Sequence, residues 1–236
     1  MRDIRAITLD LDDTLWEIAP VIHRAEAALQ DWLTRNCPRI MERFSGEALL
    51  ELRLGVAARH PDRSHDYRFL RKRVLAEAAL AAGYSEALVE PAFDVFNRAR
   101  NEVEFYPDVM PVLQTLSSRY RLIAVTNGNA CLDTIGIRAH FHDVVTAVGA
   151  GAAKPARSIF DEAVRRSGVE RHSILHVGDH PENDVEGARS AGLRAAWLNR
   201  NGSEWPAHLA DPEAVLATLA ELVELLDPAA AVGMRR

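Results

Sequence analysis

The feature that most limits the possible folds is a regular alternation of helix-like and strand-like segments over residues 110–226. Segments with apolar residues at helical spacing alternate with short runs rich in branched apolar residues, which are typical of strands. The helical segments are 110–120, 155–168, 182–192 and 212–226, and the strand segments are 121–127, 141–148, 173–179 and 193–199. Strands that alternate with helices form parallel sheets covered by helices on both faces. The sequence therefore predicts an α/β fold with a doubly wound parallel sheet.

One further strand stands apart from the others, near the N-terminus. Residues 6–9 form a short apolar run, and residues 20–101 that follow show only helical periodicity. The simplest arrangement is a Rossmann-like core of residues 1–15 and 105–236, interrupted by an inserted, all-helical domain of residues 16–104. Within the insertion, Asp66 and Ser85 are expected to cap helix starts and Gly83 to end a helix.

Composition limits the partners of the chain. Its 236 residues carry a formal net charge of -6, which gives no basic surface for nucleic acid or anionic lipid. No apolar run approaches the roughly 20 residues of a membrane span, and the first residues lack the pattern of a secretory signal. We expect a cytoplasmic protein, a monomer or homodimer, that acts on a small molecule.

Polar residues follow the ends of several predicted strands. They are Asp10 and Asp12, Thr126 and Asn127, Lys154, and Asp179 and Asp184. In open parallel sheets, ligands bind beyond the carboxyl ends of the strands, so these side chains should meet at one edge. Two carboxylates about 4 Å apart repel by roughly 4 kcal/mol at an effective dielectric of about 20. The four acids, Asp10, Asp12, Asp179 and Asp184, form an all-oxygen set suited to Mg²⁺.

The same stretches resemble the motifs of the haloacid dehalogenase (HAD) superfamily. The motifs are DxDxT at residues 10–14, Thr-Asn-Gly at 126–128, Lys-Pro at 154–155 and GDxxxxD at 178–184, in the family's order. The resemblance covers residues 1 to about 15 and about 105 to 225. The helical stretch between the first two motifs resembles the family's C1 cap domain.

The resemblance implies a role for each residue in the motifs. Asp10 would attack phosphorus and form an aspartyl-phosphate, and Asp12 would protonate the leaving group and then activate water. Thr126 and the Asn127 amide would hold the phosphoryl oxygens, which Lys154 would neutralise. Asp13 is left out of the chemistry.

A metal site is implied as well. Asp10, the backbone carbonyl of Asp12, and Asp179 would bind Mg²⁺, and Asp184 would bind it directly or support another ligand. His180 stands where many relatives carry a small hydroxyl residue, and its role is left open.

Two bulky residues near these motifs are given structural roles. His176, inside an apolar strand segment, is expected to be a satisfied core histidine. Trp16 is expected to pack at the start of the insertion rather than to stack on a substrate ring.

The resemblance to the HAD superfamily implies a Mg²⁺-dependent phosphatase for a small phosphorylated metabolite, which the sequence does not name because cap residues form no motif. A phosphomutase would share every core residue. A 2-haloacid dehalogenase of the same superfamily lacks the second acid of the first motif. A phosphoacceptor signalling module, from a different class, has neither a cap nor that acid.

Overall fold

A computed structural model describes residues 3–226, which form two compact units. Within the described residues, the core unit comprises 3–17, Glu104–Gly128 and 136–226, and the helical unit comprises Ile18–Val103 and Asn129–Ile135. The last part of the predicted core range, 227–236, lies outside the described residues.

The core unit is built on a six-stranded sheet in the order β3-β2-β1-β4-β5-β6, with all neighbouring strands parallel. The strands are β1 (Ala6–Leu9), β2 (Arg121–Thr126), β3 (Asp143–Thr146), β4 (Ile174–Gly178), β5 (Arg194–Leu198) and β6 (Val215–Leu216). Strand β1 is completely buried between β2 and β4. The strand order changes direction beside β1, and open α/β sheets bind ligands at such a point.

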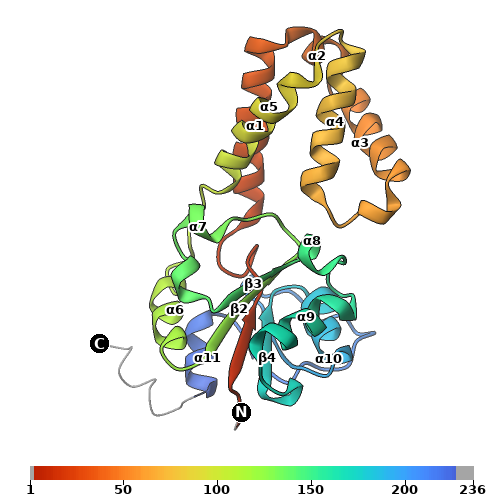
Figure 1. The fold of residues 1–236 in the computed structure, drawn as a ribbon. Helices are drawn as coiled ribbons and strands as arrows, with labels where there is room; N and C mark the ends of the chain where they lie inside the picture. Colours follow the sequence, from red (N-terminus) through yellow and green to blue (C-terminus); the bar gives the residue numbers. More distant parts are fainter. Residues whose placement is uncertain (1–2, 227–236) are drawn as a thin grey trace. The chain divides into compact units, whose positions relative to one another are not determined.

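Helices cover both faces of this sheet (Figure 1). They are α6 (Val109–Ser117), α8 (Ala147–Ala150), α9 (Arg157–Ser167), α10 (Gly187–Ser190) and α11 (Leu219–Leu226), with helical turns η3 (Arg138–His140), η4 (Arg171–Ser173) and η5 (Pro181–Glu186). Helix α9 packs on β2 and β3 through Ile159, Phe160 and Ala163, whereas α6 and α11 pack together on the other side. The predicted doubly wound α/β fold is confirmed.

One predicted element is wrong in part. The segment 212–226 was expected to be one helix, but its first half contains strand β6, and only Leu219–Leu226 is helical. Strand β6 pairs with Trp197 and Leu198 at the edge of the sheet. The hydrogen bonds of that edge outweigh the helical preference of the local sequence.

The helical unit consists of α1 (Ile18–Asn36), α2 (Pro38–Arg43), α3 (Glu47–Arg59), α4 (Tyr67–Ala81), α5 (Val89–Arg100) and α7 (Leu132–Ile135), with turns η1 (Pro61–Arg63) and η2 (Glu86–Leu88). Helices α1 and α5 pack side by side, as do α3 and α4 (Figure 1). Phe93 and Phe96 of α5 are buried in the hydrophobic core of the helical unit.

The predicted helix boundaries in this unit hold. The Asp66 carboxylate accepts a 2.9 Å hydrogen bond from the Phe69 backbone N–H and so caps α4. Gly83, just past the end of α4, has a φ of 75°, a value that glycine adopts readily. Ser85 caps the turn η2. Among residues 3–226, no helix is both long and apolar enough to cross a bilayer.

Candidate active site

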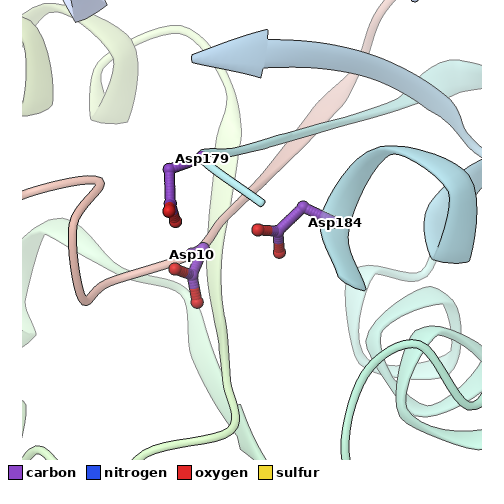
Figure 2. A group of neighbouring side chains, drawn as sticks. All are labelled: Asp10, Asp179 and Asp184. Carbon is purple, nitrogen blue, oxygen red and sulfur yellow. The ribbon is translucent and has the colours of Figure 1, made fainter. Parts of the chain in front are cut away.

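Three carboxylates converge at the carboxyl edge of β1 and β4. Asp10 directly follows β1, Asp179 directly follows β4, and Asp184 projects from the turn η5 (Figure 2). One oxygen from each side chain lies within 4.8 Å of the others. The parallel sheet brings together acids that are more than 160 residues apart in the chain. The Asp12 carboxylate is not part of this group.

Lys154 lies between two of these acids. Its Nζ donates to Asp10 Oδ1 at 2.5 Å and to Asp184 Oδ1 at 2.6 Å, and its side chain is only 3% exposed. A buried ammonium with two carboxylate partners offsets much of the repulsion between those acids. The lysine and the three acids still carry a formal surplus of negative charge.

The pKa values reflect this uneven balance. Burial alone would lower the pKa of Lys154, but the facing Asp10 and Asp184 raise it overall. Burial raises the pKa of Asp10 well above its usual range, and the neighbouring acids add to this effect despite Lys154. Burial, with the nearby Asp184 and Asp13 carboxylates, raises the pKa of Asp179 to about 7. For Asp184, Lys154 and His176 outweigh burial and lower the pKa.

A second cation would correct this balance. Lys154 contacts Asp10 and Asp184, which are buried, but it forms no hydrogen bond to the half-buried Asp179, so one lysine does not neutralise the three acids. The donor set consists only of carboxylate oxygens, which are the ligands of hard divalent cations. The acidic cluster therefore fits a metal ion held by Asp10 and Asp179 with Asp184 beside them.

His176 is the satisfied core histidine that the sequence predicts, and its contact with Asp184 gives it a supporting role that the sequence did not indicate. The ring is completely buried, with Nδ1 2.7 Å from Thr8 Oγ1 and Nε2 3.0 Å from Asp184 Oδ1. Burial lowers its pKa, so the ring is neutral, with Nε2–H donating to Asp184 and the Thr8 hydroxyl donating to Nδ1. Thr8 and His176 occupy paired positions on β1 and β4. Thr8 therefore orients the His176 ring, and the ring holds the Asp184 carboxylate.

Two neighbouring residues fix Asp184 from the other side. The His180 backbone N–H donates to Asp184 Oδ2 at 3.0 Å, while the His180 ring accepts from the N–H groups of Glu182 and Asn183. The His180 side chain thus caps the turn η5. A β-carbon built on Gly178 would lie 2.2 Å from Cγ of Asp184, so only glycine fits here.

Gly178→Ala is therefore expected to reduce the free energy of unfolding by about 1–3 kcal/mol, because it overpacks a buried site. Gly55→Ala is the matched control: the new β-carbon would meet only the end of the Arg59 side chain, at 3.3 Å. In helix α3 that change should keep or raise stability by about 0.5–1 kcal/mol. Urea denaturation measures both, and equal stability of the two variants would contradict the close packing at Asp184.

Thr126 and Asn127 lie at the end of β2, at the same edge of the sheet. Thr126 Oγ1 accepts from the Gly128 N–H at 2.9 Å. The Asn127 side chain donates to the Lys154 carbonyl at 3.0 Å and accepts from the Lys154 N–H at 2.6 Å. Its side chain therefore anchors the loop that carries Lys154. Because both polar atoms of the Asn127 side chain bind the Lys154 backbone, the group of Asn127 that could contact phosphate is its backbone N–H.

Asp12 lies two residues beyond Asp10 and is partly exposed. Its Oδ1 accepts a hydrogen bond from the indole Nε1 of Trp16 at 2.9 Å. Trp16 is completely buried and meets the Phe105 ring edge-on, so its expected packing role is confirmed, although both rings belong to the core unit rather than to the insertion. It is not available to stack on a substrate.

A cavity of about 590 Å³ lies elsewhere, inside the helical unit. Apolar side chains of α1, α3 and α4, such as Leu29, Leu49 and Val74, form most of its wall. None of the predicted site residues lines it. The chemistry of this chain therefore points to the acidic cluster, not to that cavity.

Comparison with known proteins identifies the family. Residues 4–192 match the family described as haloacid dehalogenase-like hydrolase. The chain belongs to this family. Its motifs, its sheet and its helical insertion are those expected of a HAD-like hydrolase, and the predicted family is confirmed.

Several curated relatives of this HAD-like hydrolase are phosphatases. The chain is 32% identical to 5-amino-6-(5-phospho-D-ribitylamino)uracil phosphatase of Escherichia coli, over 94% of this chain and 96% of the relative. It is 31% identical to glyceraldehyde 3-phosphate phosphatase of Methanopyrus kandleri, over 84% of each. These matches support the prediction of a phosphoric monoester hydrolase.

A solved structure carries a different description. The crystal structure of 2-haloacid dehalogenase from Pseudomonas syringae matches with a TM-score of 0.90 and 39% identity, over 94% of this chain and 97% of that one. It has the same fold as the HAD-like hydrolase described here. The activity in its name differs from that of the curated phosphatases.

Proposed function

We propose that this HAD-like hydrolase is a Mg²⁺-dependent phosphatase that cleaves a small phosphorylated metabolite through an aspartyl-phosphate on Asp10. The observation that carries the proposal is the placement of Asp10 against Lys154 and beside two further acids, with Asp12 two residues along the chain. A charged nucleophile, a buried ammonium and a nearby acid are the groups that phosphoryl transfer requires.

In the first step, Asp10 attacks phosphorus. Lys154 holds Oδ1 of Asp10, which leaves the other oxygen to form the new bond. The bond from phosphorus to the ester oxygen breaks, and Asp12 gives its proton to that oxygen. Lys154, Thr126 and the backbone N–H of Asn127 would face the phosphoryl oxygens, where negative charge develops.

In the second step, water releases the phosphate. Asp12, now ionised, takes a proton from the water, which attacks phosphorus and frees the Asp10 carboxylate. Inorganic phosphate leaves, and Asp12 is again protonated for the next cycle. Asp184, held by His176 and the His180 N–H, keeps Lys154 in place throughout.

Asp10, Asp179 and the Asp12 carbonyl would hold Mg²⁺, with Asp184 as a direct ligand or as the support of another. When bound, the ion supplies positive charge that screens the acids from each other and from the phosphate. The raised pKa of Asp179, about 7, supports this assignment, because that side chain lies among acids without a lysine of its own.

We expect excess chelator to abolish phosphate release and Mg²⁺ to restore it. Mg²⁺ should also stabilise the protein by about 2.7 kcal/mol at a concentration 100 times its Kd, and this gain should shrink in Asp179→Asn. Thermal unfolding with and without Mg²⁺ measures the second effect. Full turnover in excess chelator would exclude the metal from the reaction.

The substrate is sought by a phosphate-release screen with Mg²⁺, using Asp10→Asn as the blank. The substrates named for the relatives, a phosphorylated ribitylaminouracil and glyceraldehyde 3-phosphate, come first. Sugar phosphates, phosphoglycolate, nucleoside monophosphates and flavin mononucleotide follow. Failure of every phosphate ester, with an intact fold, would contradict the phosphatase.

A 2-haloacid dehalogenase is the second candidate, because the solved structure from Pseudomonas syringae carries that description. In that reaction Asp10 would attack carbon, and the halide would leave without a proton. Asp12 would then have no leaving group to protonate, and its presence favours the phosphatase. Halide release from 2-haloacids in the same screen, without Mg²⁺, decides between the two.

Three further assignments belong to this proposal. Residues 16–104 act as a C1 cap that selects the substrate, and residues 1–15 and 105–236 act as the catalytic domain. The enzyme works in the cytoplasm. It is a monomer or homodimer, and light scattering can measure this oligomeric state. Sustained phosphate release would separate it from a phosphomutase, which returns the phosphoryl group, and from a phosphoacceptor module, which retains it.

A further inference from the structure

We propose that Trp16 is a positioning residue that orients Asp12 for proton transfer through its indole N–H. This inference rests on the proposed function, in which Asp12 is the acid and then the base. The Nε1 to Oδ1 distance is 2.9 Å, and Trp16 is completely buried while Asp12 is partly exposed. A buried donor thus holds a carboxylate whose task requires access to substrate.

Backbone hydrogen bonds fold residues 11–16, which include Asp12 and Trp16, into a tight turn. The N–H groups of Thr14 and Leu15 donate to the Leu11 carbonyl at 3.2 and 2.7 Å, and the Asp13 N–H donates to the Trp16 carbonyl at 2.7 Å. This turn fixes the start of the Asp12 side chain and the start of the indole at once. The hydrogen bond between them therefore lies within one short turn.

The indole ring is also fixed at its far side. Its centroid lies 5.9 Å from that of Phe105, with an interplanar angle of 65°, and Trp16 and Phe105 form an antiparallel bridge. The Tyr106 N–H donates to the Leu15 carbonyl at 3.1 Å, which ties the same two segments together. Rotating the indole away from Asp12 would break this packing, so the N–H restricts how the carboxylate turns.

Restricting the carboxylate matters because proton transfer depends on geometry. A displacement of 1 Å can cost about 100-fold in rate. Simple packing at position 16 would need only an aromatic ring, which phenylalanine also provides. Trp16→Phe removes the N–H and keeps a ring against Phe105, so it separates the two roles.

With an alkyl phosphate, Trp16→Phe should lower kcat roughly 10- to 100-fold with little change in KM. Trp205→Phe is the matched control, since its indole N–H donates to the Leu209 backbone carbonyl, at 3.4 Å, and its kcat should stay near wild type. In an Asp12→Ala background, Trp16→Phe should add no further loss. An equal loss in both backgrounds, or wild-type kcat in Trp16→Phe, would overturn the proposal.

A measurement without substrate tests the contact itself. In protein labelled with nitrogen-15 on its four tryptophans, the indole signal of Trp16 is assigned by its absence from Trp16→Phe. Asp12→Ala should shift this signal and leave that of Trp205 in place. An unmoved Trp16 signal would show that the hydrogen bond is absent. If the wild type released no phosphate but the signal moved, the proposed function would fail while the contact stood.

Discussion

Lys154→Met is expected to lower the free energy of unfolding by about 3–5 kcal/mol, because it leaves two buried carboxylates without their shared partner. The Lys154 side chain is 3% exposed, and those of Asp10 and Asp184 are 9% and 2% exposed. Methionine keeps the length and apolar stem of lysine, so the variant removes the charge without leaving a large cavity. Urea denaturation without added metal gives the stability.

The same variant should lose activity. A charge-assisted contact to a phosphoryl oxygen is worth about 1.5–3 kcal/mol, so kcat/KM should fall roughly 10- to 150-fold. In the presence of Mg²⁺ the loss of stability should be smaller, because another cation would screen the same acids.

The chain offers a matched control in its other lysine, Lys72. Lys72 donates to Glu90 at 2.6 and 2.8 Å, but the Glu90 side chain is 66% exposed. An exposed pair of this kind contributes at most about 1 kcal/mol, so Lys72→Met should stay close to wild type in stability. If Lys154→Met were as stable and as active as Lys72→Met, Lys154 would not serve the acidic cluster.

The positions of the acids could be predicted from sequence because strand ends are easy to recognise. An apolar run followed by Asp10, and another followed by Asp179, place both residues at the carboxyl edge of any parallel sheet. No knowledge of strand order is needed for that step. The structure brings Asp10, Asp179, Asp184 and Lys154 together as the pattern indicates.

The supporting contacts could not be predicted, since they depend on register. His176 reaches Asp184 and Thr8 only because β4 lies beside β1 with Thr8 and His176 paired. Nothing in the local sequence of either strand gives that alignment. A polar residue in each of two apolar strands was the available signal, and it indicates a pair only once the strands are known to be neighbours.

Strand β6 and the contacts of the Asn127 side chain could not be predicted from the local sequence for a related reason. Val215 and Leu216 lie in a segment with helical periodicity, and they become β6 through pairing with β5. Likewise, the Asn127 side chain has a suitable place in its motif to bind phosphate, but both of its polar atoms meet the backbone of Lys154. Contacts between distant segments decided both outcomes.

Asp12→Asn should nearly abolish turnover of alkyl phosphates, by about 10²- to 10⁴-fold, because an alkoxide leaving group needs the proton that Asp12 supplies. The side-chain oxygen of asparagine can still accept the Trp16 N–H, so the turn that holds residue 12 should be kept. The change therefore removes proton transfer with little effect on structure. Steady-state phosphate release from an alkyl ester measures it.

Asp13→Asn is the matched control one residue away. Asp13 has a φ of 61°, a conformation that asparagine tolerates, and it takes no part in the proposed chemistry. The same chemical change at position 13 should leave alkyl phosphate turnover close to wild type. Comparable losses at both positions would indicate a general effect of negative charge near the site.

An aryl ester separates the two steps in Asp12→Asn. Nitrophenolate is a weak base that leaves without a proton, so Asp10 should still be phosphorylated. The second step needs a base for water and should slow, again by about 10²- to 10⁴-fold. We expect a burst of nitrophenolate, about one equivalent per enzyme, with the aspartyl-phosphate on Asp10 visible by intact-mass spectrometry. If both esters slowed equally and no burst appeared, Asp12 would not be the acid and base, and it would serve the metal site alone.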